Sequence, residues 1–124
     1  MPILVILERD PLLRRSLRLL LEVSNRSMFE VATREGALHV MRSQSEPCAL
    51  VLYHRLPDAD VMPTLIALAN DPALSSRHRV VVIPSLSSPL ARPLPAAFEK
   101  VDVRIVSFPY NLSALQQAVD SATR

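Results

Sequence analysis

The chain has 124 residues, 49% of them apolar, and its 14 basic and 12 acidic residues leave a formal net charge of +2. A chain of this size and composition can bury one full hydrophobic core, so we expect a single domain over residues 1–124. The charges are scattered, which predicts no nucleic-acid-binding surface, and Arg14, Arg15 and Arg18 are expected on a solvated helix face.

Rare residue types exclude several kinds of site. Cys48 is the only cysteine, which rules out an internal disulfide and clusters of thiolate ligands and favours a reducing, cytoplasmic location. Gly36 is the only glycine, so the glycine-rich loops that bind phosphates and dinucleotides are missing. No apolar stretch approaches the ~20 residues that span a bilayer. We therefore expect a protein without a cofactor and without membrane contact.

Short runs rich in valine, isoleucine and leucine recur along the chain and predict strands. They are Ile3 to Leu7, Met28 to Ala32, Ala49 to Tyr53, Val80 to Ile83, and Val101 to Val106. Runs that lack alternation with polar residues are typical of central strands in a parallel sheet that is covered on both faces. The scarcity of glycine agrees with this arrangement, because tight hairpin turns favour glycine.

Segments with helical spacing separate these strands. Asp10 is placed to cap a first helix that has Pro11 at its first position. Thr33 is placed to cap a second helix, and a third runs from Val61 to Ala69 and stops near Asn70. Apolar residues at helical intervals are Leu13, Leu17, Leu20 and Leu21 in the first helix, Ala37, Leu38 and Met41 in the second, and Leu112, Leu115, Val119 and Ala122 in a last helix capped near Asn111.

The segment before the last predicted strand breaks this rhythm. Four prolines crowd it, namely Pro84, Pro89, Pro93 and Pro95, and each proline inside a helix costs about 3 kcal/mol. We expect a long loop there, with at most a short helix from Leu94 to Lys100. The alternation of strands and helices predicts an α/β, flavodoxin-like doubly wound parallel sheet of five strands. Its expected order is 2-1-3-4-5, with helices on both faces and a shortened or irregular fourth helix.

Five sequence anchors stand in an order and spacing that resemble a known family. They are Leu4 to Pro11, Leu50 to Asp60, Asn70-Asp71-Pro72, Val80 to Ile83, and Phe108-Pro109-Tyr110. Together they make nearly the whole chain similar to the receiver domain of bacterial two-component response regulators. The resemblance implies the same parallel sheet and a role in signalling, with no enzymatic activity of the domain's own.

The positions that carry phosphotransfer chemistry in that family have changed here. Family receivers place two acids after the first strand, an aspartate after the third, a Ser or Thr after the fourth, and a lysine before the final proline. The corresponding positions of this chain hold Glu8 and Arg9, Tyr53, Pro84 followed by Ser85, and Phe108. The resemblance is therefore to a degenerate receiver that lacks the phosphate-accepting aspartate.

The chemistry of these residues predicts a pocket that does not accept a phosphoryl group. Magnesium prefers hard oxygen ligands, and Glu8 alone remains of the family's metal-binding acids, with Arg9 beside it. A tyrosine cannot form the acyl phosphate that an aspartate forms. We expect Arg9 to pair with Glu8 or Asp58 and Phe108 to pack beside Tyr53, which would hold the pocket closed.

The sequence therefore predicts a phosphorylation-independent interaction module in signal transduction or transcriptional control. Its partner is expected to be a kinase, a regulator or a second copy of the chain, bound through the last strand and helix. The candidate contact residues are Arg104, Val106, Tyr110, Gln116 and Gln117. The alternative is a receiver that keeps a weak response to an ion or small ligand through Glu8, Asp10 and Asp58.

Overall fold

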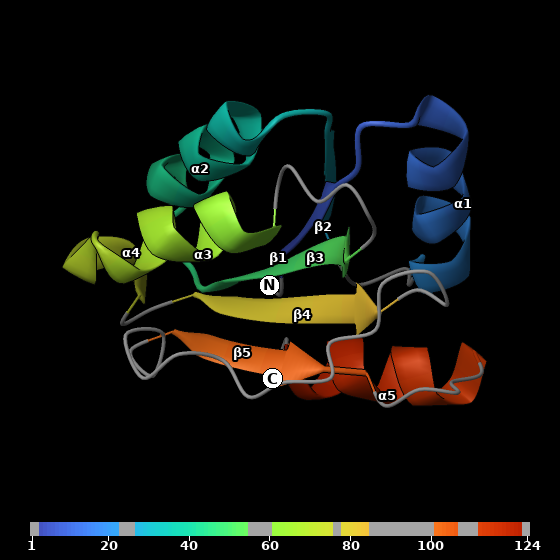
Figure 1. The fold of residues 1–124 in the computed structure, drawn as a ribbon. Coiled ribbons are helices and arrows are strands. Elements are labelled where there is room, and N and C mark those ends of the chain that lie inside the picture. Colours follow the sequence, from blue (N-terminus) through green and yellow to red (C-terminus); the bar gives the residue numbers. More distant parts are fainter. Residues whose placement is uncertain are drawn as a thin grey trace.

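The computed structural model describes residues 3–22, 27–54, 61–75, 78–84, 101–106 and 112–122. Within these segments each of the first three strands is followed by a helix, two helices precede the fourth strand, and a helix follows the fifth strand (Figure 1). The strands are β1 (Ile3–Leu7), β2 (Ser27–Val31), β3 (Cys48–His54), β4 (Arg79–Pro84) and β5 (Asp102–Ile105). The helices are α1 (Pro11–Leu21), α2 (Arg34–Ser43), α3 (Val61–Ala69), α4 (Pro72–Ser75) and α5 (Leu112–Ala122).

The strands form one parallel sheet in the order β2-β1-β3-β4-β5. This confirms the predicted flavodoxin-like, doubly wound arrangement. Every residue of β1 is buried, as expected for a strand near the middle of a sheet that is covered on both faces. The chain winds outward in opposite directions from β1 and β3, and ligands of such sheets bind beyond the carboxyl ends of the strands at that point.

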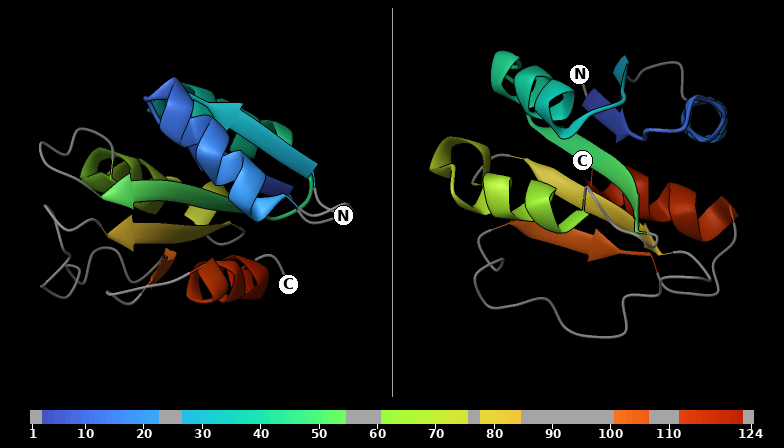
Figure 2. Two further views of the ribbon diagram at one scale, coloured as in Figure 1. Left: turned by 90° about the vertical axis from the view of Figure 1, so that its right-hand side faces the viewer. Right: turned by 45° about the horizontal axis from the view of Figure 1, so that its top comes forward.

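Helices cover both faces of the sheet, and Figure 2 shows them from two further sides. Leu4 and Ile6 of β1 belong to the apolar cluster that packs against α1 and α5. Ile3, Val5 and Leu7 belong to the cluster on the opposite face, which packs against α2, α3 and α4. The alternation follows from the two-residue period of a strand, and it gives the sheet a core on each side.

The predicted helix starts are confirmed by their capping bonds. The Asp10 carboxylate accepts hydrogen bonds from the main-chain amides of Leu12 and Leu13, and Pro11 occupies the first position of α1. The Thr33 hydroxyl accepts a hydrogen bond of 3.1 Å from the Gly36 amide at the start of α2. Local sequence therefore determines where both helices begin.

Two details of the helices differ from the sequence prediction. Of the leucines predicted to share one face of α1, Leu17 and Leu21 are buried but Leu13 and Leu20 are 37% and 43% exposed. α1 contacts the sheet along a narrow stripe, and these two residues lie at its edge. The short helix α4 was not predicted, because it is only four residues long and follows α3 almost directly.

Two predicted features lie outside the described residues: the short helix expected from Leu94 to Lys100, and the cap expected near Asn111. Among the helices that the structure does describe, none has the length and apolar character needed to cross a bilayer.

Candidate functional site

The carboxyl ends of three neighbouring strands meet at one edge of the sheet. Leu7 at the end of β1 pairs with Leu52 of β3, so Glu8, the residue after β1, is level with Tyr53 near the end of β3. On the other side of β3, Tyr53 pairs with Ile83 of β4. Pro84 is the next residue of β4. The structure thus brings together the backbone positions of Glu8, Tyr53 and Pro84, as the resemblance implied.

Glu8 is fixed at this edge by several hydrogen bonds. Its side chain is buried, and one carboxylate oxygen, Oε1, accepts a 3.0 Å hydrogen bond from the main-chain amide of Asp10. Its own amide donates to the carbonyl oxygen of Val31 at 3.1 Å, which extends the β1–β2 ladder by one residue. The carboxylate is therefore held in place by the turn that connects β1 to α1.

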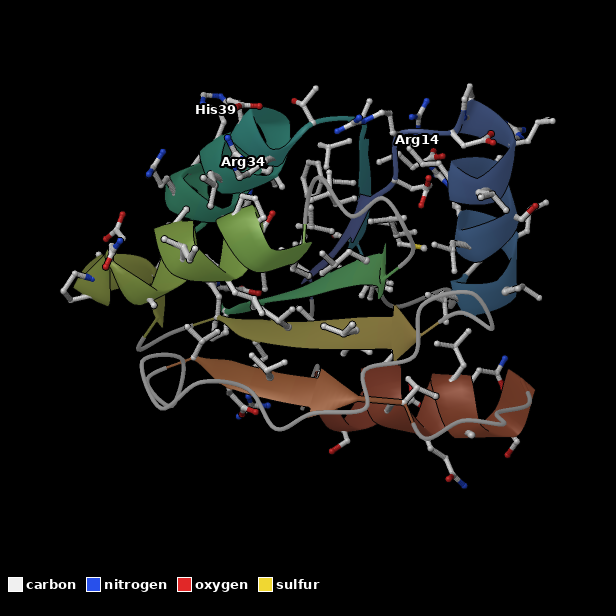
Figure 3. All side chains as sticks on the ribbon, viewed as in Figure 1. Arg14, Arg34 and His39 are labelled. Atoms are coloured by element: carbon white, nitrogen blue, oxygen red, sulfur yellow. The ribbon has the colours of Figure 1, made fainter. Side chains whose placement is uncertain are left out.

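Arg14 supplies a positive charge at the same edge. Its Nη1 atom donates a 2.9 Å hydrogen bond to the main-chain oxygen of Glu8, and its side chain is half-buried. In Figure 3 Arg14 lies on the side of α1 that faces the ends of the first two strands, while Arg34 and His39 lie apart from it on α2. The guanidinium places a fixed cation beside the buried Glu8.

Sequence reasoning missed this role of Arg14. Arg14, Arg15 and Arg18 were expected on a solvated helix face, but only Arg15 of the three is exposed, and Arg14 and Arg18 are half-buried. Arg18 forms an ion pair of 2.7 Å with Glu30 of β2. The side chain of Arg9 is exposed, and its expected pairing with Glu8 or Asp58 stays a prediction. The available signal was the spacing of Arg14, one helical turn after the cap at Asp10.

The two described acidic residues at this edge, Glu8 and Asp10, each use one carboxylate oxygen in a hydrogen bond to the main chain. Oε1 of Glu8 accepts the Asp10 amide, and Oδ1 of Asp10 is engaged in capping α1. The Arg14 guanidinium lies against the Glu8 backbone and would repel a divalent cation there. Within the described ranges, no three histidine, cysteine or acidic side chains are grouped so that they could hold a metal.

Several predicted site residues are only partly described or lie outside the description. Ser85, Phe108, Tyr110 and Asp58 fall outside the described residues, so the expected packing of Phe108 beside Tyr53 stays a prediction. Arg104 lies on β5, paired in register with Val81 of β4. For Tyr53, Pro84 and Arg104 the structure describes the backbone, which lies in β3, β4 and β5.

The candidate partner-binding residues divide into buried and exposed ones. Val106 is only 3% exposed and packs with Leu115 and Val119, so the prediction that its side chain contacts a partner was wrong. It directly follows the edge strand β5, where α5 covers it. Gln116 and Gln117 are exposed, and Nε2 of Gln116 donates to the carbonyl oxygen of Leu20 at 3.3 Å. Gln116 therefore connects α5 to α1.

Comparison with known proteins identifies the class of fold. No known protein-family model matches the sequence, and no curated protein matches it. Solved structures do match over almost the whole chain, and they include many response regulator receiver domains. The chain has the receiver (CheY-like) fold.

Three of these structures illustrate the likeness. A receiver domain from Methylobacillus flagellatus is 20% identical, with 98% of each chain covered and a TM-score of 0.71. A sensor protein from Polaromonas sp. JS666 is 23% identical, with 98% of this chain and 95% of that chain covered and a TM-score of 0.72. A chain in the complex of histidine kinase ThkA with response regulator protein TrrA is 15% identical, with both chains covered completely and a TM-score of 0.69.

Proposed function

We propose that this chain is a phosphorylation-independent, receiver-like protein–protein interaction module in signal transduction or transcriptional control. The observation that carries the proposal is the combination of a complete receiver sheet with Tyr53 at the carboxyl end of β3. A phenol there cannot form the acyl phosphate that starts the conventional response. The receiver fold is kept, but Tyr53 replaces the aspartate that would be phosphorylated.

The fixed charge at the pocket supports the same proposal. Phosphoryl transfer to an acyl oxygen depends on a metal ion and a lysine that neutralise the phosphoryl oxygens. Here the Arg14 guanidinium is bonded to the Glu8 backbone, and Phe108 stands at the family's lysine position. Among the described residues, Arg14 therefore keeps a positive charge at this edge without any metal ion or phosphoryl group being bound.

A protein is the expected partner, and it is a kinase, a regulator or a second copy of the chain. The similarity to a chain from a kinase–regulator complex is consistent with a protein partner, because the same fold takes part in that assembly. We further propose that the module has no enzymatic activity of its own, requires no cofactor, binds neither nucleic acid nor membrane, and acts in the cytoplasm.

Phosphorylation can be tested directly by intact-mass spectrometry. The protein is incubated with magnesium and acetyl phosphate, beside a conventional receiver as a positive control. We expect the control to gain the mass of a phosphoryl group and this chain to remain unmodified. Labelling of this chain, with a change in its association with a partner, would contradict the proposal.

The alternative function is a weak response to an ion or small ligand through Glu8, Asp10 and Asp58. The hydrogen bonds already made by Glu8 and Asp10 count against it, because they engage one oxygen of each carboxylate with the main chain. A magnesium titration that shifted the amide signals of Glu8 and Asp10 would favour this alternative over the first proposal.

A further inference from the structure

One side of α1 carries leucines that the fold leaves in contact with solvent. Leu12 is 79% exposed, Leu19 is 64% exposed, and Leu13 and Leu20 are 37% and 43% exposed. Because a helix repeats every 3.6 residues, Leu12 and Leu19 lie two turns apart in one row, and Leu13 and Leu20 lie two turns apart in the adjacent row. We call these four residues the leucine strip.

The leucine strip is not needed to attach α1 to the sheet. Leu17 and Leu21 perform that task from the buried side of the helix. At the Leu20 end of the row formed by Leu13 and Leu20, Gln116 of α5 donates a hydrogen bond to the Leu20 carbonyl oxygen. The row formed by Leu12 and Leu19 lies farther from the sheet. Clusters of large apolar side chains on a surface mark binding sites more often than isolated ones do.

The outer edge of the strip carries one positive and one negative side chain. Arg15 is three residues after Leu12 and four before Leu19, and Glu22, the C-cap of α1, is three residues after Leu19. Both side chains are exposed, and within the described part of the chain neither is engaged in an ion pair. Arg15 and Glu22 are seven residues apart, so they lie on the same edge of the helix.

This pattern is complementary to itself. When two copies of a helix pack antiparallel about a two-fold axis, the same edge of each helix faces the other and the direction is reversed. If the two-fold axis passes midway between Arg15 and Glu22 along the helix, Arg15 of each copy lies opposite Glu22 of the other copy. Leu19 of both copies then lies beside the axis. A partner with an edge of a single charge would match one of these two side chains and repel the other.

We infer that the leucine strip is a docking surface for a second copy of this chain, with the two α1 helices antiparallel and Arg15 paired with Glu22 across the interface. The inference rests on the proposed interaction function and makes it more specific, because it names self-association through α1 as one of the interactions. It also moves the expected dimer contact from the last strand and helix to α1, with Gln116 at its border.

The dimer is expected to be weak, because one helix face offers much less than the ~800 Å² per partner of a standard interface. We expect a Kd on the order of 100 μM, so the association depends on local concentration. Sedimentation velocity over a wide range of protein concentrations is a suitable measurement. The wild-type chain should move from monomer to dimer, and a chain that stays monomeric into the millimolar range would overturn the inference.

Charge exchange tests the predicted pairing. Arg15→Glu alone and Glu22→Arg alone each place two like-charged pairs in the interface, so each should weaken self-association by about tenfold. The Arg15→Glu/Glu22→Arg double variant restores both pairs, and so does an equimolar mixture of the two single variants. Both should recover nearly wild-type association. Failure of either to recover would contradict the antiparallel pairing, and recovery also shows that the single variants are folded.

An apolar substitution with a matched control tests the strip itself. Leu19→Ser should reduce self-association at least tenfold, whereas Ile66→Ser on α3, at a comparably exposed position on the other face, should leave it unchanged. Equal effects of the two variants would show that the strip is not the interface. Self-association is measured without a phosphoryl donor. A negative result here therefore leaves the result of the acetyl phosphate experiment open, and the two proposals can fail separately.

Discussion

Arg14 donates a 2.9 Å hydrogen bond from its guanidinium to the main-chain oxygen of Glu8, and this contact joins the first helix to the end of the first strand. It lies at the edge where receivers assemble their phosphorylation pocket. The Arg14 side chain thus holds a positive charge at a place where phosphorylation of a conventional receiver would bring in a metal ion and a phosphoryl group. The consequences for stability and for chemistry can be measured separately.

Removal of the Arg14 side chain should destabilise the fold. Arg14→Ala removes a hydrogen bond from a charged donor to a backbone oxygen beside the buried Glu8, so we expect a loss of about 1–2 kcal/mol in the free energy of unfolding. Arg15→Ala, one residue further along the helix, is the control and should change stability by less than about 0.5 kcal/mol. Urea denaturation of dilute samples measures both. Similar values for the two variants would show that the Arg14 contact contributes nothing.

His78 is expected to stabilise the opposite edge of the sheet. It is buried, and its Nδ1 atom accepts a 2.8 Å hydrogen bond from the main-chain amide of Cys48 at the start of β3. His78→Phe keeps an aromatic ring but removes this acceptor from the buried Cys48 amide, which should cost about 1–3 kcal/mol. His39 is exposed on α2, so His39→Phe is the control and should change stability by less than about 0.5 kcal/mol. Thermal unfolding at neutral pH measures the change in stability of each variant.

A carboxylate alone should not restore phosphorylation. Tyr53→Asp returns the family's nucleophile to the end of β3, but Phe108 still occupies the lysine position and Arg14 still binds the Glu8 backbone. We expect Tyr53→Asp to remain unlabelled by acetyl phosphate in magnesium, as judged by intact mass. Rapid labelling of this variant would show that the rest of the pocket had kept its catalytic groups, and that Tyr53 was the only block.

The architecture could be predicted because it depends on local patterns. Apolar runs gave the strands, and the sheet order followed from the alternation of strands and helices and from the handedness of their connections. Asp10 and Thr33 marked the helix starts, since a cap is a contact between residues two or three positions apart. Such contacts are independent of how the elements later pack.

The misplaced residues depend on packing between elements. Arg14 contacts Glu8 because α1 is rotated so that this residue faces the strand end, and that rotation is set by Leu17 and Leu21 against the sheet. Val106 is buried because α5 lies over it. Leu13 keeps the helical spacing of a core residue but lies beyond the edge of the contact. Sequence spacing defines a face, and the docking of the helix decides how much of that face is covered.

The most direct test of the central claim is an amide NMR titration of the wild-type chain with magnesium and beryllofluoride, a mimic of the phosphoryl group. The account predicts that the signals of Glu8 and Tyr53 do not move, because Tyr53 stands at the position of the family's nucleophile and Glu8 alone remains of its metal-binding acids. Saturable shifts of both signals at millimolar concentrations or below would contradict it and would show a receiver that still responds at its pocket.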